Sequence, residues 1–225
     1  MKVGTDGMLL GAWSRAEGCR SLLDIGCGCG LVALMLAQRN GGAAVTGVEI
    51  DAPSAADAVR NAHGSPFAGR VEIVKADVTR LDFGLRRFDC IVSNPPYHEE
   101  ELLPPAAGRA VARHTAGGGL TFAALLRVVA RWLAPPPAPS RFSVVLPASA
   151  RERFETLALL HGLYLVRRTD VVTRPGKPPK RVLLEFRRER PLSPCQPDTL
   201  ALVGDDGRRS EAYDALCRDF YLRRS

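Results

Sequence analysis

The sequence contains no apolar run that approaches the ~18 residues of a membrane-spanning helix. No hydrophobic segment follows the basic residue Lys2, so we expect neither a secretory signal nor a membrane partner. The six cysteines lack the spacing of a disulfide framework, and two of them, Cys27 and Cys29, lie in a glycine-rich segment. We therefore expect reduced thiols and a cytoplasmic location rather than a disulfide-stabilised secreted fold.

Aromatic residues are few, at 6%, but 46% of the 225 residues are hydrophobic, which is enough for a full core. No internal repeat or Ser/Gly-rich linker divides the chain. The length and composition predict a single domain over residues 1–225, which we expect to act as a monomer, and they exclude a disordered or collagen-like chain.

Lysine is scarce, because 27 of the 31 basic residues are arginine. The basic excess is local: residues 140–190 carry 12 basic and 5 acidic side chains, a surplus equal to the formal net charge of +7. A clustered basic surface is typical of proteins that bind a polyanion such as nucleic acid. The alternative is that a GC-rich genome placed arginine at neutral positions.

Short β-type runs alternate with helical patterns, which predicts an α/β fold with a parallel sheet covered by helices. One helix should begin near Asp51, with Pro53 at an early position that needs no N–H donor, and end at Gly64. The final helix should be capped by Ser210. Strands are expected at 21–25, 45–50, 71–75, 88–92 and 142–146, and helices at 31–38, 51–64, 120–133, 151–160 and 211–222.

Two further strand-like runs, 163–172 and 181–186, follow one another without a helix between them. Their linker, residues 173–180, is too short and too rich in proline for a crossover helix, so the two strands should pair in antiparallel orientation. Five parallel units closed by an antiparallel hairpin differ from the six parallel strands of a nicotinamide-binding domain.

Three glycines at alternate positions, Gly26, Gly28 and Gly30, follow the first expected strand. Such a turn lets a ligand approach the backbone, and its G-x-G-x-G spacing differs from the G-x-G-x-x-G of dinucleotide-binding folds. Asp24 lies just before the turn, where its carboxylate can face a cationic group. Cys27 and Cys29 have no second Cys or His pair, so we expect small packing residues and no metal site.

Acidic residues also follow the next two expected strands. Glu49 can accept both hydroxyl protons of a ribose, and Asp77 can meet an adenine amino group. A nucleoside that carries a positively charged amino-acid tail describes S-adenosylmethionine. The alternative is a glycine-rich turn with a purely structural role.

The segment Asn94-Pro95-Pro96-Tyr97 follows the fourth strand, at the carboxyl edge of the sheet, where open α/β folds bind ligands. The two prolines remove backbone donors and fix φ, which leaves rigid carbonyl acceptors. The Asn94 side chain adds an acceptor, and Tyr97 offers a face for stacking. Two acceptors beside a ring suit a planar amino group; the alternative is a rigid loop without a ligand.

The segments 24–30 and 94–97 resemble those of class I methyltransferases that act on amino groups. The opening segment, residues 2–13, and the closing segment, residues 210–222, are more specific, together with 113–115, 168–171 and 181–184. They resemble the bacterial tRNA1(Val) (adenine-37-N6)-methyltransferases, and this resemblance extends from residue 2 to about residue 222.

The resemblance implies a Rossmann-like class I methyltransferase fold, with a seven-stranded sheet, a C-terminal antiparallel hairpin and helices on both faces. It implies S-adenosyl-L-methionine as cofactor, a valine tRNA as partner, and Asn94, Pro95, Pro96 and Tyr97 as the catalytic residues that hold the target amine. The usual N-terminal extension of the family is expected to be absent. The expected cofactor-binding residues are Lys2, Thr5, Asp24, Gly26, Gly28, Gly30, Glu49, Ile50, Asp77, Val78 and Asn94.

An adenine in an anticodon loop is already unpaired, so its presentation costs less than extrusion from a duplex. The basic hairpin is expected to hold the neighbouring phosphates. For His114, an ordinary loop role is an equal alternative. The expected RNA-binding residues are Arg113, His114, Arg174, Lys177, Lys180 and Arg181.

Three rival functions fit part of this pattern. A protein-(glutamine-N5) methyltransferase also uses Asn-Pro-Pro-Tyr, but it predicts a further domain for its protein partner. Another nucleic-acid adenine-N6 methyltransferase, acting on DNA, normally needs a separate target-recognition region. A non-catalytic RNA-binding module would have no use for the acidic residues and the Asn-Pro-Pro segment.

Overall fold

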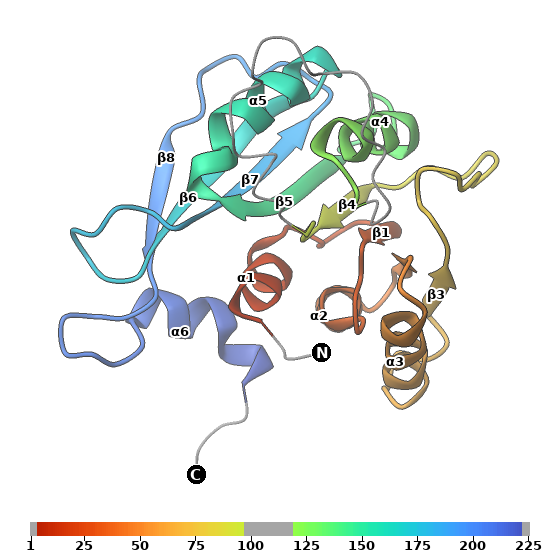
Figure 1. Ribbon diagram of the computed structural model, residues 1–225, viewed down its shortest axis with the longest axis horizontal. Coiled ribbons are helices and arrows are strands. Elements are labelled where there is room, and N and C mark those ends of the chain that lie inside the picture. The colour runs from red at the N-terminus through yellow and green to blue at the C-terminus, as the bar shows by residue number, and fades with distance from the viewer. Residues whose placement is uncertain (1–3, 97–118, 222–225) are drawn as a thin grey trace.

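The computed structural model describes residues 4–96 and 119–221. Within these residues, eight strands form one sheet in the order β3-β2-β1-β4-β5-β7-β6-β8 (Figure 1). The strands are β1 (Ser21–Ile25), β2 (Ala44–Glu49), β3 (Val71–Lys75), β4 (Cys90–Ser93), β5 (Arg141–Pro147), β6 (Tyr164–Val172), β7 (Arg181–Arg187) and β8 (Pro197–Ala201).

The strands from β1 to β5 are parallel, as the alternation of strands and helices predicted. The predicted antiparallel hairpin is also confirmed, because β7 pairs antiparallel with both β5 and β6. The predicted strand number of seven was one too few, since β8 pairs parallel with β6 and extends the sheet. This edge strand begins at Pro197 and is mostly exposed, so no apolar alternation marks it in the sequence.

Helices cover both faces of the sheet, as expected (Figure 1). In the view of Figure 1, α4 (Phe122–Trp132) and α5 (Arg151–Leu160) lie above the sheet. Below it lie α1 (Thr5–Trp13), α2 (Leu31–Arg39), α3 (Ala52–His63) and α6 (Glu211–Cys217). Across residues 4–96 and 119–221, no helix combines the length and the apolar character that a bilayer crossing requires.

The core has two parts, one on each side of the sheet. Leu22 packs into the cluster under α1 and α2, whereas the next residue of β1, Leu23, packs into the cluster under α4 and α5. Because successive side chains of a strand point to opposite faces, a strand covered on both sides must be apolar throughout. This is why the central strands appear in the sequence as unbroken apolar runs.

The helix boundaries follow their capping residues. Asp51 caps α3 by accepting a hydrogen bond from the Ser54 N–H, and Ser210 caps α6 by accepting from the Tyr213 N–H, which confirms the predicted cap. The predicted range 211–222 for the last helix was too long, because α6 ends at Cys217 and a 3₁₀ turn, Arg218–Phe220, follows.

The sequence pattern did not predict α1. Every residue from Gly7 to Trp13 is buried, so this helix has no polar face to reveal a helical period. A Cβ at Gly11 would lie 2.6 Å from the Met35 sulfur, so glycine at this position lets α1 pack directly on α2. The first turn of α1 carries Thr5, one of the predicted cofactor-binding residues.

Candidate active site

The predicted site residues lie where neighbouring strands end at the same edge of the sheet. The segments 24–30, 49–50, 77–78 and 94–96 accompany the carboxyl ends of β1, β2, β3 and β4, which pair in parallel. Ligands of open α/β sheets bind outside the carboxyl ends of the strands. The fold therefore brings these four segments together although they are far apart in the sequence.

The glycine-rich turn after β1 is held by backbone hydrogen bonds. The N–H groups of Gly26 and Cys27 donate to the Val48 carbonyl of β2 at 2.9 and 3.1 Å. Gly26, Gly28 and Gly30 have φ values of 71°, 56° and 84°, a region that L side chains rarely occupy. The turn itself therefore requires all three glycines.

Two of these glycines differ in what surrounds them. A Cβ at Gly26 would meet no atom within 4 Å, whereas a Cβ at Gly30 would lie 3.3 Å from the Ala58 Cβ of α3. Gly26 thus leaves open backbone that a ligand can approach, and Gly30 permits close packing of the turn on α3. Cys27 is buried, and burial raises the pKa of its thiol, as expected of a packing residue.

Asp24 is 1% exposed, and its carboxylate accepts a hydrogen bond of 3.0 Å from the Ala33 N–H in the first turn of α2. Because the N-cap residue Gly30 has no side chain, Asp24 supplies the missing cap from the strand. Burial raises the pKa of Asp24 to about 7, and the nearby Glu49 carboxylate acts in the same direction. A cationic ligand group beside Asp24 would favour its ionised form.

The Glu49 carboxylate is fixed by two backbone donors. Its Oε2 accepts from the Gly28 N–H and its Oε1 accepts from the Asp51 N–H, both at 2.8 Å. Each carboxylate oxygen can accept a second hydrogen bond, so the side chain keeps one acceptor position on each oxygen. This oriented pair of oxygens suits two adjacent hydroxyl groups.

At the end of β3, Asp77 Oδ1 accepts from the N–H and the hydroxyl of Thr79 at 2.9 and 2.7 Å. These bonds lower the pKa of Asp77, so its carboxylate is ionised and remains an acceptor. Ile50 is 58% exposed beside Glu49 and offers apolar surface, whereas Val78 is buried in the core. The two apolar residues predicted for the cofactor thus have different surroundings.

The Asn-Pro-Pro segment begins directly after β4. Ser93, the last residue of β4, is the ladder partner of Ile25, and its buried hydroxyl donates a 2.9 Å hydrogen bond to the Ile25 carbonyl. Asn94 is half-buried, Pro95 is buried and Pro96 is exposed. The segment therefore leaves the sheet beside the residue that precedes the glycine-rich turn.

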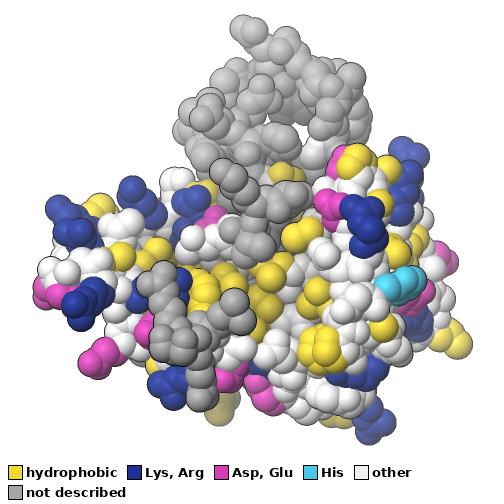
Figure 2. Space-filling model, turned by 90° about the horizontal axis from the view of Figure 1, so that it is seen from below, with side chains coloured by type: hydrophobic (Ala, Val, Ile, Leu, Met, Phe, Trp, Pro, Cys, Tyr) yellow, Lys and Arg dark blue, Asp and Glu magenta, His cyan; other side chains and the backbone are white. Residues whose placement is uncertain are grey.

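Three of the predicted RNA-binding residues, Arg174, Lys177 and Lys180, are exposed on the turn between β6 and β7. Since β6 and β5 are both antiparallel to β7, this turn lies at the same edge as the ends of β1 to β5. Figure 2 shows Lys and Arg side chains, with some Asp and Glu side chains among them, at the end of the molecule where Figure 1 places this turn. Among the residues that the structure describes, no acidic side chain pairs with these three cations.

Much of the remaining basic stretch serves the fold, so the exposed basic cluster is narrower than the range 140–190. Arg181 is half-buried, and its Nε donates to Asp6 of α1 at 2.9 Å, so it is less available to RNA than its three neighbours. Further arginines of this stretch bind internal partners: Arg167 pairs with Glu185, Arg168 with Asp170, and Arg188 donates to the carbonyls of Ala130 and Leu133.

Comparison with known proteins identifies the family. Residues 5–133 match the methyltransferase small domain family. The tRNA1(Val) (adenine(37)-N6)-methyltransferase of Bacteroides fragilis is 42% identical over 226 residues, which cover 99% of this chain and 92% of the relative. The protein of the same name from Dickeya chrysanthemi is 43% identical over 228 residues, covering 99% and 88%. The chain belongs to the tRNA1(Val) (adenine(37)-N6)-methyltransferase family.

A solved structure supports the fold of this methyltransferase. A protein described as a "predicted O-methyltransferase" from Agrobacterium tumefaciens matches with a TM-score of 0.68 at 21% identity, covering 98% of this chain and 100% of that one. At this identity the likeness concerns the fold alone. It agrees with the class I methyltransferase architecture that the sequence predicted.

Four predicted site residues of the methyltransferase, Lys2, Tyr97, Arg113 and His114, lie outside the described residues, and their roles stay predictions. Among residues 4–96 and 119–221, no group of three or more His, Cys, Asp or Glu side chains is arranged to hold a metal ion. All six cysteines are free thiols.

Sequence reasoning missed two positioning features of the methyltransferase. One is Ser93, which ties the end of β4 to β1; its place directly before Asn94 is the only signal the sequence offered. The other is a clamp on α1, where the Arg167 guanidinium carbon lies 3.5 Å from the centre of the Trp13 ring and the Trp13 Nε1 donates to Thr169 Oγ1 at 2.9 Å. The residues of this clamp are more than 150 positions apart, so no local pattern could reveal it.

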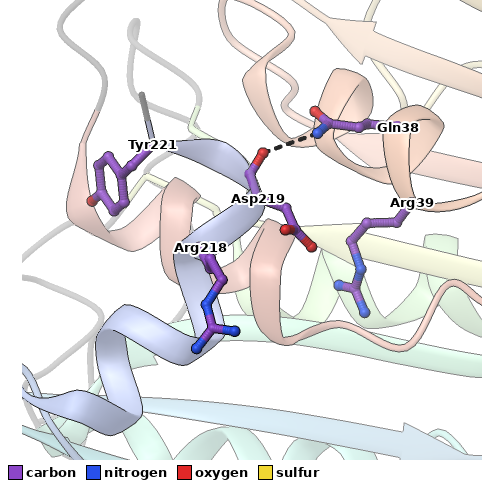
Figure 3. Close-up of a pocket in the computed structure, with 5 residues that line it drawn as sticks. All are labelled: Gln38, Arg39, Arg218, Asp219 and Tyr221. Atoms are coloured by element: carbon purple, nitrogen blue, oxygen red, sulfur yellow. Dashed lines mark hydrogen bonds between the residues drawn. The ribbon is translucent and has the colours of Figure 1, made fainter. Parts of the chain in front are cut away.

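A hollow of about 380 Å³ lies away from this site, between the end of α2 and the 3₁₀ turn after α6 (Figure 3). The Gln38 side chain donates to the Asp219 carbonyl across it at 3.0 Å. The Arg39 guanidinium in its wall already donates to the carbonyls of Gly11, Ala12 and Ser14. Because α2 runs back from the active-site edge, this hollow belongs to the opposite edge of the sheet.

Proposed function

We propose that this protein transfers a methyl group from S-adenosylmethionine to the N6 nitrogen of an adenine in tRNA, at position 37 of a valine tRNA. The observation that carries the proposal is the adjacency of Ile25 and Ser93, which places the glycine-rich turn beside the Asn-Pro-Pro segment. A methyl donor held by the first segment would lie next to an amine held by the second. The names of the relatives, at 42% and 43% identity, support the same reaction and the same RNA.

The described residues fit this cofactor. Gly26 leaves open backbone, Glu49 keeps two oriented acceptors for the ribose hydroxyls, and Asp24 supplies a carboxyl for the ammonium group. Bound S-adenosylmethionine supplies an electrophilic methyl group on a sulfonium sulfur. The exposed side chain of Ile50 offers apolar surface for the adenine ring, and Asp77 an acceptor for its amino group. Lys2, Thr5, Gly28, Gly30, Val78 and Asn94 complete the proposed cofactor site.

The target amine is a weak nucleophile because its nitrogen lone pair is shared with the adenine ring. We assign the Asn94 side-chain oxygen and the Pro95 carbonyl as acceptors for its two N–H bonds. Both bonds favour a more pyramidal nitrogen whose lone pair can attack the methyl carbon in line. Tyr97 would stack on the ring, and Pro96 keeps the loop rigid. The displaced proton leaves after transfer, so orientation and electrostatics carry the step without a strong base.

The RNA would be held by the exposed turn between β6 and β7, at the same edge as the site. Arg174, Lys177 and Lys180 are available for phosphates, and Arg113 and His114 are assigned to the substrate by their place after the Asn-Pro-Pro segment. We propose that the enzyme acts as a monomer. Its tRNA substrate supports a cytoplasmic place of action.

The decisive experiment supplies labelled S-adenosylmethionine together with bulk tRNA, DNA or ribosomal protein in separate reactions. We expect label in tRNA, located in N6-methyladenosine at position 37 of a valine tRNA. Asn94→Ala should lower kcat/KM by roughly 100- to 1000-fold, the scale of losing one oriented transition-state contact. Asn40→Ala, which removes an amide that binds the Ala16 and Cys19 carbonyls, is the matched control and should keep the wild-type rate.

The outcomes separate the rival functions. Label that enters only protein would favour a glutamine methyltransferase, and label that enters only DNA would favour a DNA methyltransferase. Full activity of Asn94→Ala would remove the assignment of the amine site. Binding of RNA without any binding of S-adenosylmethionine would leave an RNA-binding module in place of the enzyme.

A further inference from the structure

A second, smaller hollow of about 170 Å³ lies between the first turns of α1, the end of β6 and the beginning of β7. Its apolar lining comes from α1, from β6 and from the segment after β8, and its polar lining is gathered around the β6–β7 turn. The apolar residues are Leu9, Val171, Val172 and Leu202, and the polar residues are Thr5, Asp6, Thr173, Lys180 and Arg181. Thr5 also belongs to the proposed cofactor site, so the hollow borders that site.

The hollow opens at the active-site edge of the sheet. Arg181 is the ladder partner of Pro147 in β5 and of Val171 in β6, and the Lys180 carbonyl accepts a 3.1 Å hydrogen bond from the Ala148 N–H. From β4, which ends before Asn94, to β6 there are three strand spacings of about 4.8 Å, or roughly 14 Å. At the rise of about 3.4 Å per nucleotide that a strand has in duplex DNA, this distance corresponds to a few nucleotides.

The size and lining of the hollow restrict its occupant. Pockets for drug-sized ligands usually measure about 300–1000 Å³, so 170 Å³ is too small for a whole cofactor and suits a single ring system. Leu9 is fully buried, and Val171 and Val172 are 2% and 5% exposed, so the inner wall is apolar and firmly packed. These three side chains expose almost no surface, so the apolar surface that a flat heterocycle can lie against is mainly that of the half-buried Leu202.

The rim of the hollow can bind the two polar parts of a nucleotide, the exocyclic amino group of its base and its phosphates. Asp6 Oδ2 is engaged by the Arg181 Nε at 2.9 Å, which fixes the carboxylate at the rim with acceptor capacity for an exocyclic amino group. Lys180 lines the hollow, and Arg174 and Lys177 are exposed on the same turn. Positive charge therefore borders an apolar recess, which complements a base whose own phosphates carry negative charge.

We propose that this hollow is a nucleotide subsite, which takes one base of the substrate RNA that flanks the target adenine while the β6–β7 turn holds its phosphates. The proposal rests on the proposed function and adds to it a second point of contact between enzyme and RNA. A base in this recess would fix the register of the RNA strand and so select which adenine reaches Asn94. The Asp6 carboxylate favours a base that carries an amino group over uracil.

The test combines a filled hollow with an RNA that lacks one base. Thr173→Trp would extend an indole over the recess, while the Thr173 carbonyl keeps its bond to the Val203 N–H. Thr199→Trp, on the exposed edge strand β8, makes the same exchange outside the recess and is the control. The substrates are the tRNA and versions with one abasic site, placed in turn at each of the few nucleotides on either side of the target adenine. Leu202→Phe fills the recess from another wall if Thr173→Trp does not fold.

On one abasic tRNA, we expect the wild-type enzyme to lose roughly tenfold in kcat/KM, the scale of one lost stacking contact. Thr173→Trp should lose about as much on intact tRNA and nothing further on that abasic tRNA, with unchanged affinity for S-adenosylmethionine. Additive losses, or wild-type indifference to every one of these abasic sites, would overturn the subsite. Loss of cofactor affinity in Thr173→Trp would also overturn it, because the hollow would then belong to the cofactor site. Absence of methyl transfer to any tRNA would instead show that the proposed function itself is wrong.

Discussion

Ser93 and Ile25 are ladder partners at the ends of two adjacent parallel strands, and the Ser93 hydroxyl donates a buried hydrogen bond of 2.9 Å to the Ile25 carbonyl. The glycine-rich turn begins one residue after Ile25, and the Asn-Pro-Pro segment begins one residue after Ser93. The proximity of the two segments is therefore set by strand register and by one side chain. Rigid strands hold such a geometry more closely than loops do.

We predict that Ser93→Ala lowers kcat by roughly tenfold or more while affinity for S-adenosylmethionine changes little. The glycine-rich turn keeps its own bonds to the Val48 carbonyl, so the cofactor half of the site should persist. The Asn-Pro-Pro half loses its tether, and small displacements of a reacting group cost large factors in rate. The lost buried bond should also reduce the free energy of unfolding by about 1–3 kcal/mol. Single-turnover methylation and urea unfolding measure the two effects.

Ser143→Ala is the matched control for that variant. Ser143 is a fully buried strand serine like Ser93, but its hydroxyl has no hydrogen-bond partner among the described residues. Removal of an unpaired buried hydroxyl should be neutral or stabilising. If Ser143→Ala slowed the reaction as much as Ser93→Ala, the loss would reflect strand packing in general and the tether would have no special part.

From the raised pKa of Asp24 we predict that the free energy of unfolding depends on pH in an unusual way. Burial raises its pKa in the folded protein from 3.8 to about 7, so the folded protein binds this proton more tightly than the unfolded chain does. The resulting stabilisation is complete below about pH 4 and is lost as the pH rises through about 7. Asp24→Asn can still accept from the Ala33 N–H. Its stability relative to wild type should therefore increase by a few kcal/mol as the pH rises from 5 to 8. Urea unfolding without cofactor at both pH values measures this difference.

Asp77→Asn provides a control of opposite sign. The hydrogen bonds from Thr79 lower the pKa of Asp77, so its stabilisation is present above the unfolded pKa and is lost as the pH falls. Asp77→Asn should therefore lose stability relative to wild type at neutral pH, and this loss should shrink in acid. A flat difference between Asp24→Asn and wild type across the whole range would show that Asp24 is not buried as the structure has it.

The basic turn predicts a specific change in the salt dependence of RNA binding. Replacement of Arg174, Lys177 and Lys180 by Ala removes three phosphate contacts, each worth a slope of about 0.7 for single-stranded RNA. The plot of log affinity for tRNA against log salt concentration should therefore become shallower by about 2, with unchanged cofactor affinity. Filter binding at several salt concentrations measures the slope.

A triple variant of equal charge tests whether position matters in that result. Arg20 is exposed directly before β1, and Arg60 and Arg127 are exposed on the outer helices α3 and α4. Their replacement by Ala should leave the slope nearly unchanged, because they lie away from the active-site edge. Equal slopes for the two triple variants would remove the turn from the RNA-binding surface and leave only an effect of net charge.

The parallel sheet could be predicted from the sequence because its central strands are buried on both faces and therefore form unbroken apolar runs. The site could be predicted for a related reason: glycines with positive φ and acidic residues at strand ends are local signals, and parallel pairing brings strand ends together. The hairpin was predictable because Pro-rich residues 173–180 exclude a crossover helix.

Other features depend on contacts that no local pattern contains. Strand β8 was missed because it is mostly exposed and begins at Pro197, and α1 was missed because it is buried all round. The surplus of arginine in 140–190 suggested a broad basic surface, but Arg167 and Arg168 are paired with internal partners. A count of charges along the chain cannot separate a paired arginine from an exposed one.

The pairing of Arg167 leads to the last prediction, which concerns Glu185. This carboxylate is fully buried and lies 3.0 Å from an Arg167 nitrogen and 3.7 Å from an Arg187 nitrogen. Arg167 in turn donates to the Trp13 carbonyl at 2.8 Å and covers the Trp13 ring, which clamps α1 on the sheet. Burial lowers the pKa of Arg167 to about 10, so it stays charged at neutral pH and needs its counterion.

Glu185→Ala should therefore lower the free energy of unfolding by about 3–5 kcal/mol, the usual cost of leaving a buried charge without its partner. The exposed pair of Asp206 and Arg208 is the comparison, and Asp206→Ala should cost less than about 1 kcal/mol. Denaturant unfolding of wild type, Glu185→Ala and Asp206→Ala measures these differences in the free energy of unfolding. A small effect of Glu185→Ala would mean that water, rather than this carboxylate, compensates Arg167, and that α1 is held on the sheet by its apolar contacts alone.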